Sequence, residues 1–240
     1  MIQIETENAF IMDDHKFSLP FIGEKNLAIK EIINDYLAHG KRLWEPETTK
    51  IVKENVKETD ICVDVGASIG YFTLLFARLG RMVYSFEPTA NQYDYLCANI
   101  RLNDYTNVIP HNLAAWDKEE DNFVRRDNLG HGNKIQINNT TTEGMKGVAL
   151  DEVLPEKVDF IKIDVDGSEP RVLKGLIKTF ERNPQLKLVI EYYPECIKKL
   201  GNDPKDMMDI LDKYFIYTPI KGDLGDDYWN YYCIRRTKIK

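Results

Sequence analysis

The length, composition and charge of the chain exclude several classes of protein. Its 240 residues are 43% hydrophobic, which fits one core with a small appendage, and its formal net charge of −7 provides no basic surface for nucleic acid. It contains no run of about 20 apolar residues and no signal-peptide pattern, so we expect a cytoplasmic protein without a membrane span. The four cysteines and four histidines form no disulfide or metal signature, and we expect no metal site.

Beyond the N-terminal region, the chain alternates between strand and helix patterns. Short apolar runs predict strands at 61–65, 82–86, 107–111, 158–164 and 186–191, and helical patterns lie between them at 71–79, 89–102 and 169–182. This alternation predicts a doubly wound parallel sheet with right-handed crossovers. A helix opened by Asp203 and Pro204 follows, and the aromatic-rich runs 214–219 and 228–235 predict an antiparallel hairpin at the edge of the sheet.

Two segments do not follow this alternation. The stretch 2–21 predicts short strands, and 26–39 and 46–57 have helical patterns. We interpret residues 1–43 as an N-terminal cap over the carboxyl edge of the sheet and residues 44–240 as the main domain. The second segment, at 117–150, is an irregular insert with four glycines, which fits a binding loop or lid and equally a partly disordered surface hairpin.

The turn after the first of these strands is the most informative segment. The stretch 63–72 has the sequence VDVGASIGYF, and Gly66 and Gly70 mark a tight turn at the carboxyl end of a strand, where open parallel sheets bind ligands. A pyrophosphate favours G-x-G-x-x-G, whereas Ser68 stands in the middle here. A cofactor without phosphate, such as S-adenosylmethionine, fits better. Asp64 is placed to bind its ammonium, and amides of the turn to bind its carboxylate.

An acidic residue follows the next strand. Glu87 lies about 20 residues after Gly66, where a carboxylate accepts both ribose hydroxyls of a nucleoside cofactor. Pro88 ends the strand, and Thr89 is a suitable N-cap for the following helix. The combination predicts a nucleoside-cofactor site, and the structural alternative is a tight turn beside two solvated acids.

Several motifs resemble those of one known family. They are WEPE at 44–47, VDVGASIGYFT at 63–73, FEP at 86–88, NLAA at 112–115, LDEVL at 150–154 and KIDVDGSEPRVLKG at 162–175. With these motifs the chain resembles the FkbM-type methyltransferases over roughly residues 44 to 192. It departs from the usual pattern in having Ser68 for Asn and Asp166-Gly167-Ser168 for Glu-Gly-Ala.

The resemblance implies a fold, a cofactor and an acceptor class. The fold is a Rossmann-like sheet of seven strands, the methyl donor is S-adenosylmethionine, and the acceptor is a hydroxyl on a polyketide, a sugar or another glycan. The residues implied at the cofactor are Asp64, Gly66, Gly70 and Glu87, with Asn112 and Leu113 near the adenine. The motifs extend this predicted set to Glu45, Ala67, Ser68, Tyr71, Phe72, Pro88, Ala114 and Asp164.

Candidates for the chemistry lie at the ends of the later strands. Methyl transfer from a sulfonium is an in-line displacement that positioning and a base assist. Asp164 ends one strand and Glu191 the next, and we predict that both are catalytic. Asp164 and Asp166 are alternatively a pair of Mg²⁺ ligands, and Glu169 alternatively begins a helix, where its charge offsets the helix dipole. Lys162, if buried, needs an acidic partner, expected from a neighbouring strand.

The identity of the acceptor and some alternatives stay open. The aromatic side chains of Tyr192, Tyr193, Trp229 and Tyr231 either line an acceptor pocket or pack in the core. An NAD(P)-dependent oxidoreductase and a cofactor-binding module without catalysis are the competing functions, because fold alone does not establish function. We expect a small-molecule or glycan partner.

Overall fold

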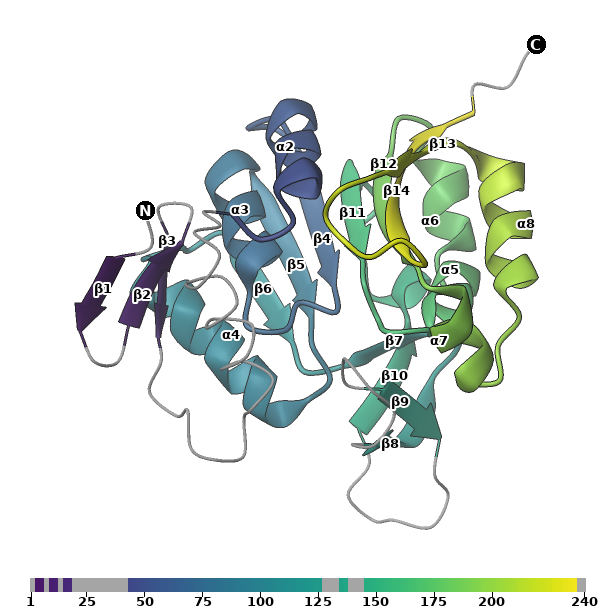
Figure 1. Cartoon of the computed structure of the whole chain (residues 1–240), viewed down its shortest axis with the longest axis horizontal. Helices are drawn as coiled ribbons and strands as arrows, with labels where there is room; N and C mark the ends of the chain where they lie inside the picture. Colours follow the sequence, from purple (N-terminus) through teal and green to yellow (C-terminus); the bar gives the residue numbers. More distant parts are fainter. Residues whose placement is uncertain are drawn as a thin grey trace.

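A seven-stranded sheet forms the centre of the structure, a computed structural model that describes residues 3–6, 9–12, 15–18, 43–126, 134–137 and 145–236 (Figure 1). The strand order is β13-β14-β12-β11-β4-β5-β6. In that order the strands are Phe215–Ile220, Trp229–Arg235, Lys187–Tyr192, Phe160–Ile163, Ile61–Val65, Met82–Phe86 and Val108–His111. β14 is antiparallel to both of its neighbours, and the other adjacent pairs are parallel. This confirms the predicted sheet and its C-terminal hairpin.

The strand order changes direction at β4, which is the topological switch point of the sheet. From β4 it continues outward through β5 to β6, and it later returns to β11 on the other side of β4. In open α/β sheets, the carboxyl ends of the strands on either side of such a switch point bind ligands. The glycine turn that follows β4 and the residues that follow β11 both lie there.

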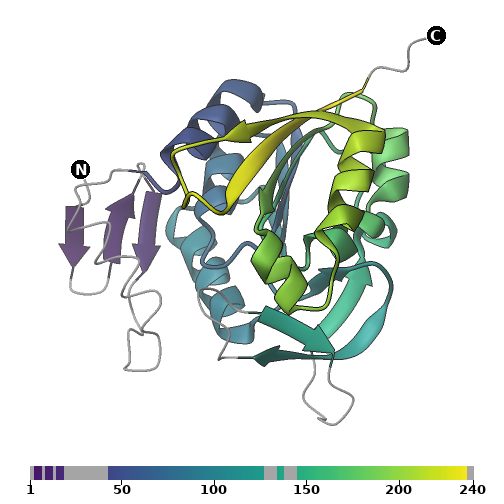
Figure 2. The ribbon, with the colours of Figure 1, turned by 45° about the vertical axis from the view of Figure 1, so that its right-hand side comes forward.

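Helices cover both faces of the sheet (Figure 2). One face packs on α2 (Pro46–Asn55), α3 (Tyr71–Leu79) and α4 (Ala90–Leu102), and the other on α5 (Glu169–Lys174), α6 (Ile177–Arg182) and α8 (Pro204–Tyr214). In β4, Val63 and Val65 enter the core beneath α5, whereas Cys62 enters the core beneath α3. Because side chains alternate along a strand, Asp64 shares the face of Cys62. In the described ranges, no helix has the length and apolar character needed to cross a membrane.

The predicted continuous helix over 169–182 is wrong. It divides into α5 and α6 at Gly175, where a Cβ atom would lie 2.0 Å from the carbonyl oxygen of Trp116. The second helix begins with its own cap, because the Asp151 carboxylate accepts the backbone amides of Lys178 and Thr179 at 2.9 and 2.7 Å. A short helix that the sequence did not predict, α7 (Pro194–Lys199), follows β12.

The insert at 117–150 is more regular than expected. Its strands β8 (Glu120–Arg126), β9 (Lys134–Ile137) and β10 (Met145–Ala149) join β7 (Ala114–Trp116) in a second sheet of order β7-β10-β8-β9. β8 and β9 pair as an antiparallel hairpin, in agreement with the hairpin alternative. Residues 127–133 and 138–144 lie outside the described residues, and a lid role for the insert stays a prediction.

The described part of 1–43 lies beside α4. Strands β1 (Gln3–Thr6), β2 (Ala9–Met12) and β3 (His15–Ser18) form a small antiparallel sheet, and His15 Nε2 lies 2.8 Å from the hydroxyl oxygen of Tyr105, just beyond the C-terminus of α4. The predicted helix at 26–39 lies outside the described residues. The cap over the carboxyl edge therefore stays a prediction.

Candidate functional site

The glycine turn after β4 is shaped by its contact with the end of β11. Gly66 has a φ of 83°, and a Cβ atom there would lie 1.8 Å from the carbonyl oxygen of Asp164. Gly70 has a φ of 102°, and its Cβ would lie 2.8 Å from Leu96 Cδ1. Both positions require glycine, because L-residues with a side chain disfavour this φ region and because neighbouring atoms fill the space. The turn therefore brings the carboxyl ends of β4 and β11 into direct contact.

The amides of this turn donate hydrogen bonds within the protein. Gly66 N and Ala67 N donate to the carbonyl oxygen of Phe86 at 2.9 and 3.0 Å, and Gly70 N donates to the carbonyl oxygen of Ala67 at 2.8 Å. Ser68 N donates to Glu87 Oε2 at 2.9 Å. The expectation that the turn amides bind the carboxylate of the cofactor does not fit at these four residues, because their hydrogens already have acceptors.

Glu87 joins the turns after β4 and β5. It is buried, and in addition to Ser68 N it accepts the amide of Thr89 through Oε1 at 2.8 Å. Burial raises the pKa of Glu87 above its usual range, although these hydrogen bonds oppose the shift. Each carboxylate oxygen can accept more than one hydrogen bond, so Glu87 retains the capacity to bind ribose hydroxyls.

The residues predicted near the adenine lie next to Glu87. Asn112 Nδ2 donates to the carbonyl oxygens of Glu87 and Pro88 at 2.8 and 3.0 Å, so this amide fixes the backbone of the turn. Leu113 packs partly buried against the main core, and Ala114 is buried at the start of β7. Because Asn112 Nδ2 already donates to these two carbonyl oxygens, a contact with adenine would involve other atoms of Asn112, Leu113 or Ala114.

Asp64 lies buried between α3 and the neighbouring strand. Its Oδ2 accepts the hydroxyl of Thr73 at 2.6 Å, and Lys162 is its register neighbour on β11. Burial raises the pKa of Asp64 to about 6, against the opposing effects of Lys162 and Thr73. The first residues of α3 are packing residues: the Tyr71 hydroxyl lies 3.1 Å from Thr49 Oγ1, and both Tyr71 and Phe72 are buried.

Lys162 and Asp164 form an ion pair beside Asp64. Lys162 Nζ lies 2.8 Å from Asp164 Oδ2, the lysine side chain being 3% exposed and the aspartate 29%. The neighbouring strand β4 supplies the expected acidic residue, Asp64, as the register neighbour of Lys162, and the direct ion pair is made by Asp164, two residues further along the same segment. The Asp164 side chain is 29% exposed, whereas the other carboxylates predicted to bind the cofactor or to act in catalysis are buried.

Glu45, in the segment before α2, is a further buried carboxylate whose pKa responds to Lys162 and Asp164. It is buried with a φ of 40°, and it accepts Trp44 Nε1 and Asn230 Nδ2, each at 2.9 Å. Burial raises the pKa of Glu45 to about 7, although Lys162 opposes the shift. Sequence reasoning missed Asn230, because nothing in the sequence pairs it with a residue 185 positions away.

The N-terminus of α2 depends on a second residue that the sequence did not reveal. The carboxylate of Asp223, in the loop between β13 and β14, accepts the amides of Glu47 and Thr48 at 2.7 and 2.6 Å. These contacts satisfy two free amides of the first helical turn. Asp223 and Asn230 together attach the segment that carries Glu45 to the C-terminal hairpin.

Two buried glutamates follow β11 and end β12. Glu191 is opposite Asn230 in the β12–β14 ladder, and burial together with Asp164 and Glu169 raises its pKa well above the usual range. Glu169 begins α5 and accepts the amides of Val165 and Gly167 at 3.1 Å, so it stabilises the start of the helix, as in the structural alternative. Burial raises the pKa of Glu169 to about 7. Within the described residues, no group of three or more His, Cys, Asp or Glu side chains is placed to hold a metal ion.

Aromatic side chains surround the end of β12. Tyr192 and Tyr231 pack against the core, with ring centroids 5.7 Å apart, as the packing alternative proposed. Tyr193 stacks on Tyr228 with ring centroids 4.7 Å apart. Burial and the charge of Glu191 raise the pKa of Tyr228. Sequence reasoning missed Tyr228.

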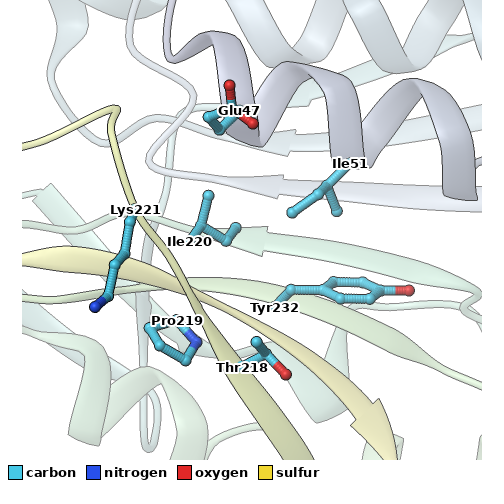
Figure 3. Close-up of a pocket in the computed structure, with 7 residues that line it drawn as sticks. All are labelled: Glu47, Ile51, Thr218, Pro219, Ile220, Lys221 and Tyr232. Atoms are coloured by element: carbon cyan, nitrogen blue, oxygen red, sulfur yellow. The ribbon is translucent and has the colours of Figure 1, made fainter.

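A separate cavity of about 230 Å³ lies between α2 and the β13–β14 hairpin (Figure 3). Its lining residues are Glu47, Ile51, Thr218, Pro219, Ile220, Lys221 and Tyr232. None of the residues predicted to bind cofactor or acceptor lines this cavity, so we assign it no part in the chemistry.

Known proteins share this fold and match the sequence of the chain. The model of the methyltransferase FkbM domain matches residues 64–217, more than half of the chain. A crystal structure of an FkbM methyltransferase from Methylobacillus flagellatus KT aligns with a TM-score of 0.53 and 20% identity, covering 74% of this chain and 44% of that chain.

Two curated relatives match over different lengths. The hexuronic acid methyltransferase AglP of Haloferax volcanii is 24% identical over 180 residues, which cover 73% of this chain and 71% of AglP. The tRNA(Phe) (4-demethylwyosine(37)-C(7)) aminocarboxypropyltransferase of Methanocaldococcus jannaschii is 38% identical over 79 residues. This chain spans 32% of the length of that second relative. The FkbM match contains the glycine turn, Glu87, Asp164 and Glu191, and with the seven-stranded sheet it establishes that the chain belongs to the FkbM family of S-adenosylmethionine-dependent methyltransferases.

Proposed function

We propose that this chain methylates a hydroxyl oxygen on an uncharged, hydroxyl-rich small molecule, such as a sugar or a glycan unit, and that Asp164 binds this hydroxyl. The position of Asp164 carries the proposal. It follows β11 in direct contact with the glycine turn, and it is 29% exposed, whereas Asp64, Glu45 and Glu191 are buried. A carboxylate that is both held and accessible suits contact with a ligand that enters from solvent.

The chain's own residues supply position and a route for the proton. S-Adenosylmethionine, when bound, supplies a methyl group that is displaced in line from its sulfonium and leaves a neutral thioether. One oxygen of Asp164 is held by Lys162, so the other is free to accept the hydrogen of the acceptor hydroxyl. As the new oxygen–carbon bond forms, that proton passes to Asp164 and then to water. Glu87 and Asp64 are the residues that would hold the ribose and the ammonium.

Glu191, which the sequence predicted to be catalytic without a defined role, contributes differently from Asp164. Burial and the nearby acids raise its pKa well above the usual range, which favours the protonated form of the carboxyl. A protonated carboxyl donates a hydrogen bond and accepts no further proton. We therefore propose that Glu191 orients an acceptor oxygen as a donor, while Asp164 accepts.

The local charge favours an acceptor without negative charge. The charge of Asp164 raises the pKa of Glu45 and of Asp64, and Lys162 is the cation that lowers both. An anionic acceptor would place another like charge in this region, which is costly in a site of low polarity. The relative AglP is named for a hexuronic acid. We expect this chain to differ from it in preferring uncharged sugars.

The experiment uses S-adenosylmethionine with a labelled methyl group, incubated with the protein and fractionated cell extract. We expect label in a low-molecular-weight fraction that passes through an anion-exchange column. Label in protein or RNA, or in products retained by the column, would contradict the proposed acceptor class.

The role of Asp164 is tested with the fraction that accepts label. Asp164→Asn should lower turnover by about 10²- to 10⁴-fold at saturating cofactor, the usual contribution of a positioned acid or base. Asp166→Asn is the matched control, because it removes a nearby charge at a residue with a φ of 53°, a conformation that Asn tolerates. Full turnover of the Asp164→Asn variant would rule out the assignment.

A further inference from the structure

Lys162 occupies a place in the sheet that is unusual for a charged side chain. It lies within β11, with Asp64 of β4 and Val189 of β12 as register neighbours. The side chain is 3% exposed, and Nζ lies 4.4 Å from the centroid of the Phe72 ring. A buried ammonium is costly unless it is paired, so its partners explain why it is retained.

Carboxylates from three separate segments act on this ammonium. Asp164 pairs with it at 2.8 Å, Asp64 is its register neighbour on β4, and the charge of Glu45, in the segment before α2, contributes to the raised pKa of Lys162. From α3, the group in contact is the uncharged ring of Phe72. These carboxylates raise the pKa of Lys162 in spite of its burial, so the lysine stays charged. Three carboxylates share one cation, and the excess negative charge suits a ligand that carries an ammonium and a sulfonium.

We propose that Lys162 is a positioning residue that keeps Asp64 ionised and Asp164 in place for the cationic end of S-adenosylmethionine, and that it thereby sets the pH range in which the protein binds its cofactor. This inference concerns the cofactor and is independent of which acceptor is methylated. The alternative is that Lys162 only fills space and stabilises the fold.

The two roles differ in their dependence on pH. Burial brings the pKa of Asp64 to about 6 while Lys162 opposes the shift, so Asp64 is ionised at neutral pH. Without the lysine the pKa of Asp64 rises further, and the residue becomes protonated nearer neutrality. A protonated Asp64 carries no charge to attract the ligand's ammonium. The loss of affinity in a variant without Lys162 should therefore be small at high pH, grow as pH falls through the variant's pKa of Asp64, and level off below the wild-type pKa.

The experiment is calorimetric titration with S-adenosylhomocysteine, which keeps the ammonium of the cofactor, from about pH 5 to pH 9 at constant ionic strength. In the wild type, affinity should fall about tenfold per pH unit below about pH 6, as expected for one linked proton. In Lys162→Met, the midpoint of this fall should move up by about one unit or more, with binding about twofold or more weaker at pH 7 and about tenfold or more weaker below about pH 6. The difference between the two proteins should shrink toward pH 9.

Two further variants separate positioning from folding. Lys162→Arg keeps the charge and should restore the midpoint. Lys187→Met is the matched control, because Lys187 lies at the start of β12 and donates to the carbonyl oxygen of Asn55 at 2.9 Å, outside the carboxylate group. This variant should leave the midpoint unchanged.

The same loss of affinity in Lys162→Met at every pH would overturn the proposal in favour of the space-filling role. If Lys162→Met does not fold, Asp64→Asn tests the same idea, since its affinity should be weaker and independent of pH between about 5 and 8. A wild-type affinity that stays constant over that range would also overturn it.

Discussion

Glu169→Gln tests whether the buried acids near the site reduce the stability of the protein. The Glu169 side chain is fully buried, and its Oε1 accepts the amides of Val165 and Gly167. Its other oxygen has no hydrogen-bond partner within the described part of the chain. Glutamine has the same shape and the same acceptor for both amides, and it mimics the protonated acid. The substitution therefore removes the charge and keeps the hydrogen bonds.

The size of the effect follows from the pKa shift. Burial moves the pKa of Glu169 from 4.5 to about 7, so between these values the folded protein holds a proton that the unfolded chain has lost. The unfolding free energy of the wild type should therefore fall as pH rises through this window and level off above about pH 7. One pKa unit corresponds to about 1.4 kcal/mol, so the total is on the order of 3 kcal/mol.

The unfolding free energy of the variant should equal that of the wild type near pH 4.5. Above pH 7 it should be larger than that of the wild type by up to about 3 kcal/mol. Urea unfolding of both proteins at a series of pH values measures the difference, in which the titration of all other groups cancels. Glu195→Gln, at an exposed carboxyl in the first turn of α7, is the matched control. A difference that does not change with pH would refute the reasoning. A wild type that is more stable than the variant at pH 8 would show that the charge-assisted hydrogen bonds outweigh the cost of burial.

Two other predictions concern the cofactor turn. Glu87→Ala should weaken S-adenosylhomocysteine binding by about 1–3 kcal/mol, because it removes the predicted ribose acceptor and the acceptor of Ser68 N and Thr89 N; an unchanged dissociation constant in calorimetry would rule out the ribose assignment. Gly66→Ala should destabilise the protein by more than about 1 kcal/mol and abolish detectable cofactor binding, because its Cβ would lie 1.8 Å from the carbonyl oxygen of Asp164. Thermal unfolding and titration check both effects, and a Gly66→Ala variant with wild-type melting temperature and affinity would show that the turn has room to adapt.

Local patterns in the sequence were sufficient to predict the central strands and the helix between them. The strands 61–65 and 82–86 and the helix 71–79 have the predicted bounds, because apolar runs and the glycines between them are signals that neighbouring residues carry. Parallel strands joined by helices place their carboxyl ends at one edge, so the sequence also brought Asp64, Glu87 and Asp164 to one side of the sheet. Their roles toward the cofactor and the acceptor stay predictions.

Contacts between segments that are distant in the sequence decided the features that were predicted incorrectly. The helix predicted over 169–182 breaks because Gly175 packs against a carbonyl 59 positions earlier in the chain, at Trp116. The amides of the glycine turn, predicted to bind the cofactor, are taken by Phe86 and Glu87 once β5 lies beside β4.

The electrostatic character of the site is likewise a tertiary property. A carboxylate's pKa depends on how much water it loses and on which charges lie within a few ångströms, and neither is determined by neighbours along the chain. The sequence by itself specified that Glu45, Asp64, Lys162 and Glu191 are present on elements of one domain. Only folding buried them together, which leaves Lys162 as the shared cation, keeps Asp164 accessible and raises the pKa of Glu191 well above its usual range.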